Sequence, residues 1–118
     1  MKKTLIFLFL SVLLTSCNNS QPKITHIIVK SDRDGTLLDS KDREILKQIE
    51  KIFYKKTEDL NSSPEFIFLL DITRSSQTVR WHYSASGYIR NYEENNSPIF
   101  RIHSVGKFNT LLNIPKDK

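Results

Sequence analysis

The stretch from Glu65 to Thr73, EFIFLLDIT, constrains the fold more strongly than any other part of the chain. Apolar side chains stand at both odd and even positions along it, so a strand formed here has two largely apolar faces. Such a strand is typical of the interior of a sheet that is covered on both sides. The sequence therefore predicts a central strand at residues 65–73 with cover on both faces.

One amphipathic helix is predicted before this strand. Its apolar residues recur at helical spacing, at Ile45, Leu46, Ile49, Ile52 and Phe53. This period predicts a helix over residues 41–59 with one buried face. Asp39 or Ser40 is the expected cap of its amino end, because a short polar side chain there can accept hydrogen bonds from the first turn.

Further strands are expected where β-branched or alternating residues occur, over residues 24–30, 77–83, 88–92 and 99–103. Alternation places Trp81 and Tyr83 on one face and Arg80 and His82 on the other. A short helix is expected over residues 108–114. The expected fold is α+β, with one main helix packed on a mostly antiparallel sheet of four to five strands and a short C-terminal helix.

The start of the chain, MKKTLIFLFLSVLLTSC, has two lysines followed by a short apolar stretch. This pattern is typical of a secretory signal peptide, and the stretch is shorter than the roughly 20 residues of a membrane-spanning helix. Its last four residues, Leu14-Thr15-Ser16-Cys17, resemble the bacterial lipobox. The resemblance implies cleavage before Cys17 and attachment of acyl chains such as palmitate to it. An uncleaved anchor or an ordinary secretory signal remains the alternative.

The lipobox resemblance divides the chain into three expected parts. These are a lipoprotein signal peptide at 1–16, a lipidated tether at 17–23 and one small domain at 24–118. Two or more acyl chains hold a protein stably on a membrane. Asn18 follows the lipidated position, and its resemblance to enterobacterial sorting signals implies the outer membrane, with the domain facing the periplasm.

Cysteine and charge content limit the function of the mature domain. Cys17 is the single cysteine, so the mature domain has no internal disulfide and no thiol for catalysis or zinc binding. Removing Lys2 and Lys3 with the leader lowers the formal charge from +5 to about +3. Outside the cytoplasm, this basic balance favours lipid head groups, cell-wall polymer or an acidic protein over nucleic acid.

Residues 31–36, SDRDGT, resemble the nucleophile loop of the haloacid dehalogenase-like phosphatases, in which a strand ends in D-x-D-G-T. The resemblance implies Asp32 as nucleophile and Asp34 as general acid and base. The family also has a parallel sheet and a later acidic residue for magnesium, for which Asp71 is the lone candidate. Since only one long helix follows, the sequence favours a β-turn for this stretch.

An Arg-x-His pattern occurs twice, at Arg80-His82 and at Arg101-His103, on two predicted strands. Alternation places each pair on one face, and Arg90 can lie between them. Together these five side chains could bind a phosphate or carboxylate through charge-assisted hydrogen bonds. A solvated sheet face is the plainer interpretation. Two histidines with no evident third ligand do not predict zinc.

Two further groups of side chains have both a functional and a structural interpretation. A basic stripe on the predicted helix could contact anionic lipid head groups or could simply be its solvent face; it consists of Arg43, Lys47, Lys51 and Lys55. An aromatic group near the predicted hairpin could stack on a sugar or a partner, or could belong to the core; it consists of Trp81, Tyr83, Tyr88, Tyr92 and Phe100.

Together these features predict a lipid-anchored envelope lipoprotein that acts as a non-catalytic binding or interaction module. An inhibitor or immunity-like protein and an accessory factor of an envelope complex both fit. We expect no cofactor or metal, and no nucleic acid as partner. The expected partners are the membrane, through Cys17, and an envelope protein. The alternatives are a phosphatase using Asp32 and Asp34, and a binder of anionic cell-envelope ligands.

Overall fold

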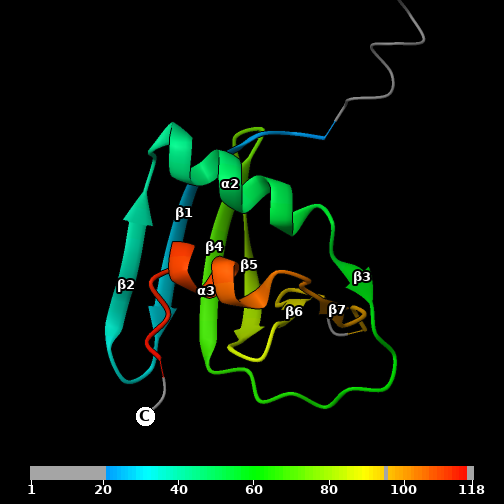
Figure 1. Ribbon diagram of the computed structural model, residues 1–118. Coiled ribbons are helices and arrows are strands. Elements are labelled where there is room, and N and C mark those ends of the chain that lie inside the picture. The colour runs from blue at the N-terminus through cyan, green and yellow to red at the C-terminus, as the bar shows by residue number, and fades with distance from the viewer. Residues whose placement is uncertain (1–20, 95, 117–118) are drawn as a thin grey trace, which may run out of the picture.

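The computed structural model describes residues 21–94 and 96–116. These residues form a seven-stranded sheet in the order β2-β1-β4-β5-β6-β7-β3 (Figure 1), and every neighbouring pair is antiparallel. The predicted signal peptide and the predicted lipidation site at Cys17 lie outside the described residues.

Four long strands make up most of the sheet; they are β1 (Ile24–Ser31), β2 (Gly35–Ser40), β4 (Phe68–Arg74) and β5 (Gln77–Ser84). Three shorter strands complete one edge; they are β6 (Tyr88–Asn91), β7 (Phe100–Arg101) and β3 (Thr57–Glu58). Strands β1 and β2 form one hairpin and β4 and β5 another, and β1 pairs with β4 between them.

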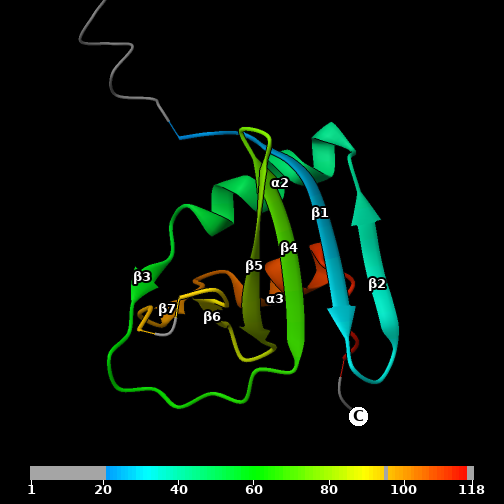
Figure 2. The same ribbon diagram turned by 180° about the vertical axis from the view of Figure 1, so that it is seen from behind.

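Two helices pack on the same face of the sheet, α2 (Arg43–Phe53) and α3 (Val105–Leu111). Both lie in front of the strands in Figure 1, and the strands lie in front of both helices in the reverse view of Figure 2. The opposite face of the sheet therefore carries no helix of the described residues. Neither helix is long and apolar enough to cross a membrane.

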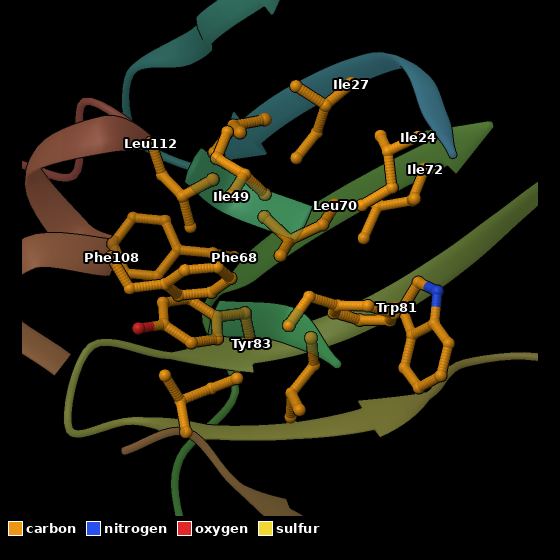
Figure 3. Close-up of a cluster of buried hydrophobic side chains, with 14 of the residues drawn as sticks. Ile24, Ile27, Ile49, Phe68, Leu70, Ile72, Trp81, Tyr83, Phe108 and Leu112 are labelled. Atoms are coloured by element: carbon orange, nitrogen blue, oxygen red, sulfur yellow. The ribbon is translucent and has the colours of Figure 1, made fainter. Parts of the chain in front are cut away.

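The hydrophobic core lies between this face of the sheet and the helices (Figure 3). Helix α2 contributes Leu46, Ile49 and Phe53, and α3 with its last turn contributes Phe108 and Leu112. These side chains meet alternate residues of the central strands, which are Ile27, Val29, Phe68, Leu70, Ile72, Trp81 and Tyr83. Each large apolar side chain buried in this way stabilises the fold by about 1.5–3 kcal/mol.

The predicted arrangement of one main helix on four to five strands is wrong. The structure is mostly a seven-stranded antiparallel sheet with two short helices. The sequence pattern did not predict β2 as a full strand, nor β3, whose two residues pair with β7. The predicted helix at 41–59 is also too long, because the chain turns after Phe53 and runs on to β3.

The predicted cover on both faces of the 65–73 strand is also wrong. Only the face with Phe68, Leu70 and Ile72 is buried under the helices. Leu69 and Asp71 point to the uncovered face and are partly shielded by side chains of the neighbouring strands.

The predicted helix cap differs as well. Asp42 caps α2, and its Oδ1 accepts hydrogen bonds from the backbone N–H groups of Glu44 and Ile45 at 2.9 and 3.4 Å. Asp39 belongs to β2 instead, and Ser40 Oγ accepts from the Asp42 N–H at 3.1 Å, so neither predicted residue is the cap.

Candidate functional site

The uncovered face of the sheet carries a row of side chains across four adjacent strands. In the strand register, Lys30 lies beside Leu69, Leu69 beside His82, and His82 beside Arg90. The row therefore has a cation at each end and an apolar and an imidazole side chain in the middle. We call these four residues the open-face row.

His82 lies at the centre of an aromatic cluster on this face. Phe66 stacks on its ring at 5.4 Å between centroids, and Tyr92 meets it edge-on at 4.5 Å. The Arg90 guanidinium lies over the Phe66 ring at 5.3 Å. Burial and, secondarily, the charge of Arg90 lower the pKa of His82. The lowered pKa favours the neutral imidazole, which presents an aromatic surface there.

Arg80 is neutralised on the same face by Asp71 from the neighbouring strand. Its Nε and one terminal nitrogen donate to the two carboxylate oxygens of Asp71 at 2.8 and 3.0 Å. This hydrogen bonding lowers the pKa of Asp71 and raises that of Arg80. Because the guanidinium already binds a carboxylate in two places, it has little capacity for a second anion.

The structure does not gather the five residues of the predicted anion-binding face. Arg80, His82 and Arg90 share the uncovered face, but His103 follows β7 and lines a pocket beside the helices. Its Nε2 is hydrogen bonded to Thr57 Oγ1 at 2.8 Å. Arg101 is exposed on β7, where it pairs in register with Thr57 of β3.

A second candidate site, which we call the basic pocket, lies on the helix side where α2 approaches the start of α3. Its volume is about 240 Å³. It is lined by Gln48, Lys51, Ile52, Lys55, His103, Ser104 and Lys107. No carboxylate lines it, and none of its three lysines forms an ion pair within the described part of the chain.

Only some of the residues of the basic pocket could be predicted from the sequence. The spacing of four residues between Lys51 and Lys55 indicated a basic stripe on the helix. His103 and Lys107 join them only because α3 packs against α2, and that contact has no local sequence signal.

The phosphatase-like loop forms the turn between β1 and β2. Ser31 Oγ accepts a hydrogen bond from the Asp34 N–H at 2.9 Å, and Gly35 has a φ of 74°, which favours glycine. Asp32 and Asp34 are exposed and line a broad groove of about 770 Å³ with residues from the start of β4 and the C-terminal segment. The flanking strands are antiparallel, whereas the phosphatase family uses a parallel sheet.

The residues that would complete a magnesium site are not assembled near this loop. Asp71 lies on the uncovered face with Arg80 bound to it. Within residues 21–94 and 96–116, no three His, Cys, Asp or Glu side chains are grouped closely enough to hold a metal ion. The geometry of Asp32 and Asp34 is that of a hairpin turn.

Most of the predicted aromatic group belongs to the core or its margin. Trp81 and Tyr83 are buried, and Tyr83 donates its hydroxyl hydrogen to Asn109 Oδ1 at 2.5 Å. Tyr88 and Phe100 are half-buried. Tyr92 is 49% exposed and belongs to the cluster around His82, so it is the member available to a partner.

Lys56 is a titratable residue of the structure that the sequence pattern did not single out. Its ammonium nitrogen lies 3.8 Å from the centroid of the Phe53 ring, and the rings of Trp81 and Phe100 are at 5.3 and 5.1 Å. Burial and the nearby charge of Arg74 lower the pKa of Lys56 from 10.5 to about 8. Phe53 precedes it by three residues, but the other rings come from distant strands, which explains the omission.

The N-terminal segment of the domain is fixed along α2. The Pro22 carbonyl accepts the hydroxyl hydrogen of Tyr54 at 2.7 Å. The Ile24 N–H donates to Glu50 Oε1 at 3.0 Å, and the Ile24 carbonyl accepts from Arg43 at 3.0 Å. The chain therefore enters the domain beside one flank of this helix.

Comparison with models of known protein families, with curated proteins and with solved structures finds no significant match to this chain.

Proposed function

We propose that this chain is a lipid-anchored protein of the bacterial cell envelope and that its domain is a non-catalytic binding module. The anchor is inferred from the lipobox-like residues Leu14-Thr15-Ser16-Cys17. The binding surface is the uncovered face of the sheet, and its partner is an envelope protein with an acidic surface. An inhibitor of a toxin or enzyme and an accessory factor of an envelope complex would both act through such a face.

The observation that carries the proposed binding role is the open-face row with its aromatic cluster. Lys30 and Arg90 stand at its two ends, and neither forms an ion pair among the described residues. Asp71, the carboxylate beside the row, is bound by Arg80. The positive charge left over favours an acidic partner, because complementary charge steers association and selects partners.

The aromatic cluster supplies a second feature of binding surfaces. Phe66, His82 and Tyr92 are held against one another before any partner arrives. Aromatic and arginine side chains contribute most of the energy at many protein interfaces, and Arg90 lies over this cluster. A preordered surface also loses less side-chain entropy on binding.

Site-specific photo-crosslinking in the cells that make the protein tests this role. A benzophenone amino acid replaces Tyr92 on the uncovered face or, as control, the exposed Thr110 on α3. We expect a crosslinked envelope protein at position 92 and none at position 110. Arg90→Glu should reduce the crosslink at least tenfold, whereas the charge-matched Lys47→Glu on α2 should leave it unchanged. Equal crosslinking at both positions, or equal effects of both substitutions, would contradict the proposed face.

The proposed anchor has a separate test. Replacing Cys17 by Ser should move the protein from the membrane fraction to the soluble fraction, because the thiol that carries the acyl chain is gone. Incorporation of a labelled palmitate analogue should disappear in the same variant. A Cys17→Ser protein that remains in the membrane fraction would argue for an uncleaved leader as the anchor.

A further inference from the structure

The basic pocket concentrates positive charge that the described residues do not compensate. Lys51 lies in the last turn of α2, Lys55 lies in the turn that follows this helix, and Lys107 faces the same pocket from α3. Among the described residues, α2 forms an ion pair between Arg43 and Glu50, and neither of these residues lines the pocket. Three ammonium groups around one hollow repel one another, and a bound anion would relieve that repulsion.

The rest of the lining suits a phosphate group. Ser104 makes no side-chain cap hydrogen bond at the start of α3, so its hydroxyl is available as a donor. Three ammonium groups and a hydroxyl can satisfy several phosphate oxygens through charge-assisted hydrogen bonds. Ile52 adds one apolar wall. A volume of about 240 Å³ lies just below the range of pockets for drug-sized ligands, which favours a small polar group.

The position of the pocket favours a lipid as the source of that phosphate. Pro22 is fixed to Tyr54 on one flank of α2, and Gln48 and Ile52 on the other flank line the pocket. The five residues from Cys17 to Pro22 span at most about 18 Å when fully extended. One helix is roughly 10 Å across. A membrane that holds Cys17 is therefore within reach of the pocket.

We infer that the basic pocket binds the phosphate of an anionic phospholipid head group and thereby turns the helix layer of the domain toward the membrane. This inference rests on the proposed lipid anchor. The uncovered sheet face then points away from the lipid, toward a protein partner.

The test uses residues 17–118 with Cys17→Ser, which contain every residue of the hydrophobic core and carry no acyl chain. Sedimentation with vesicles of equal parts phosphatidylcholine and phosphatidylglycerol should capture this protein, and vesicles of phosphatidylcholine alone should not. Because acylation plays no part, failure here leaves the cell-fractionation test of the anchor unaffected.

Two charge-matched double variants distinguish lipid binding in the basic pocket from general electrostatic attraction to the anionic vesicle surface. Lys55→Gln with Lys107→Gln removes two pocket lysines, and we expect about 25-fold weaker vesicle binding, at roughly fivefold per lysine. Lys41→Gln with Lys47→Gln removes two exposed lysines outside the pocket and should have a clearly smaller effect. Lys55→Arg with Lys107→Arg keeps the charge and should retain binding.

Three results would overturn the inference. Equal losses in the two Gln double variants would show diffuse adsorption to an anionic surface. Absence of binding to the anionic vesicles would remove the lipid as ligand. Binding of glycerol phosphate in solution, followed by amide chemical shifts around Lys107, without any vesicle binding would assign the pocket to a soluble phosphate compound.

Discussion

Gly87 lies at a position where the fold does not tolerate a side chain. Its φ is 102°, and a Cβ atom added there would lie 2.5 Å from Val105 Cγ2. Gly87→Ala should therefore lower the free energy of unfolding by about 2–3 kcal/mol, through both backbone strain and the clash. Urea denaturation measures the change.

Gly35 provides the matched control for Gly87. It also has a positive φ, 74°, but an added Cβ would have no neighbour within 4 Å. Gly35→Ala should cost only the backbone strain, about 1 kcal/mol. Val105→Ala should recover part of the Gly87→Ala loss and none of the Gly35→Ala loss. Equal effects of the two glycine substitutions would contradict the proposed clash.

Lys56 should make stability depend on pH in the alkaline range. The folded pKa is about 8 and the unfolded value is 10.5, so between them the unfolded chain binds more protons at this site. The free energy of unfolding therefore rises with pH across that window. Below pH 8 the buried charge is unfavourable, although the surrounding rings and partial exposure to water reduce the cost.

Replacing Lys56 by Met tests this effect, because Met fills a similar volume without charge. At pH 7 the variant should be more stable than the parent by about 1 kcal/mol. The difference should shrink as the pH rises from about 8 to about 10, as the parent loses its proton in the folded state. Denaturant unfolding at several pH values measures it. A constant difference across this range would mean that Lys56 does not titrate there.

At the scale of elements, the Asp71–Arg80 pair joins β4 and β5 across the uncovered face. Arg80 lowers the pKa of Asp71, so the pair stabilises the fold at pH values above the unfolded pKa of about 3.8. That stabilisation is lost as the pH falls through the lower, folded pKa. Asp71→Asn should therefore destabilise the protein by about 1 kcal/mol at pH 7 and have no effect in strong acid.

A double-mutant cycle with Arg80→Gln isolates this interaction from other effects of the two substitutions. The coupling energy should be about 1 kcal/mol at pH 7 and vanish in strong acid. Thermal unfolding of the four proteins gives the energies. A coupling energy that persists in acid would show that the interaction does not depend on the ionised carboxylate.

Local side-chain patterns predicted the helices and strands that are long enough to show a repeating pattern of apolar residues. Alternation placed Trp81 and Tyr83 inward and Arg80 outward, and the structure confirms it. The two-residue strands β3 and β7 have no such period and exist only because their backbones pair. Leu69 misled the prediction, because an apolar residue on an outer strand face can be shielded by neighbours such as Lys30 and His82 without a covering helix.

The candidate sites were less predictable than the elements, for a physical reason. The sequence pattern predicted that Arg80 could bind an anionic ligand. In the structure, Asp71 of β4 lies opposite Arg80 and neutralises its charge. Conversely, no sequence pattern indicated a role for Lys107, which lines the basic pocket with Lys51 and Lys55 because α3 packs near α2. Strand pairing and helix packing decide which charges are free, and both depend on residues far apart in the chain.

At the scale of the whole molecule, the two proposed sites lie on opposite faces of one sheet. Helices α2 and α3 cover one face, and the open-face row occupies the other (Figures 1 and 2). If the lipid anchor and the basic pocket act together, the helix face lies against the membrane and the sheet face is presented to the periplasm. The molecule should therefore have one fixed orientation on its membrane.

Cysteine accessibility in the lipidated protein tests that orientation, since Cys17 is the single native cysteine and its thiol would carry lipid. Lys47→Cys places a thiol on the outer side of α2, and Thr78→Cys places one on β5, where the native side chain is exposed. In anionic vesicles a bulky maleimide should label position 47 several-fold more slowly than position 78, because the membrane shields the helix layer. The same substitutions in residues 17–118 with Cys17→Ser, free in solution, should be labelled at similar rates. Equal rates on the membrane would mean that the tether leaves the domain free to rotate, and slower labelling at position 78 would place the sheet face against the lipid.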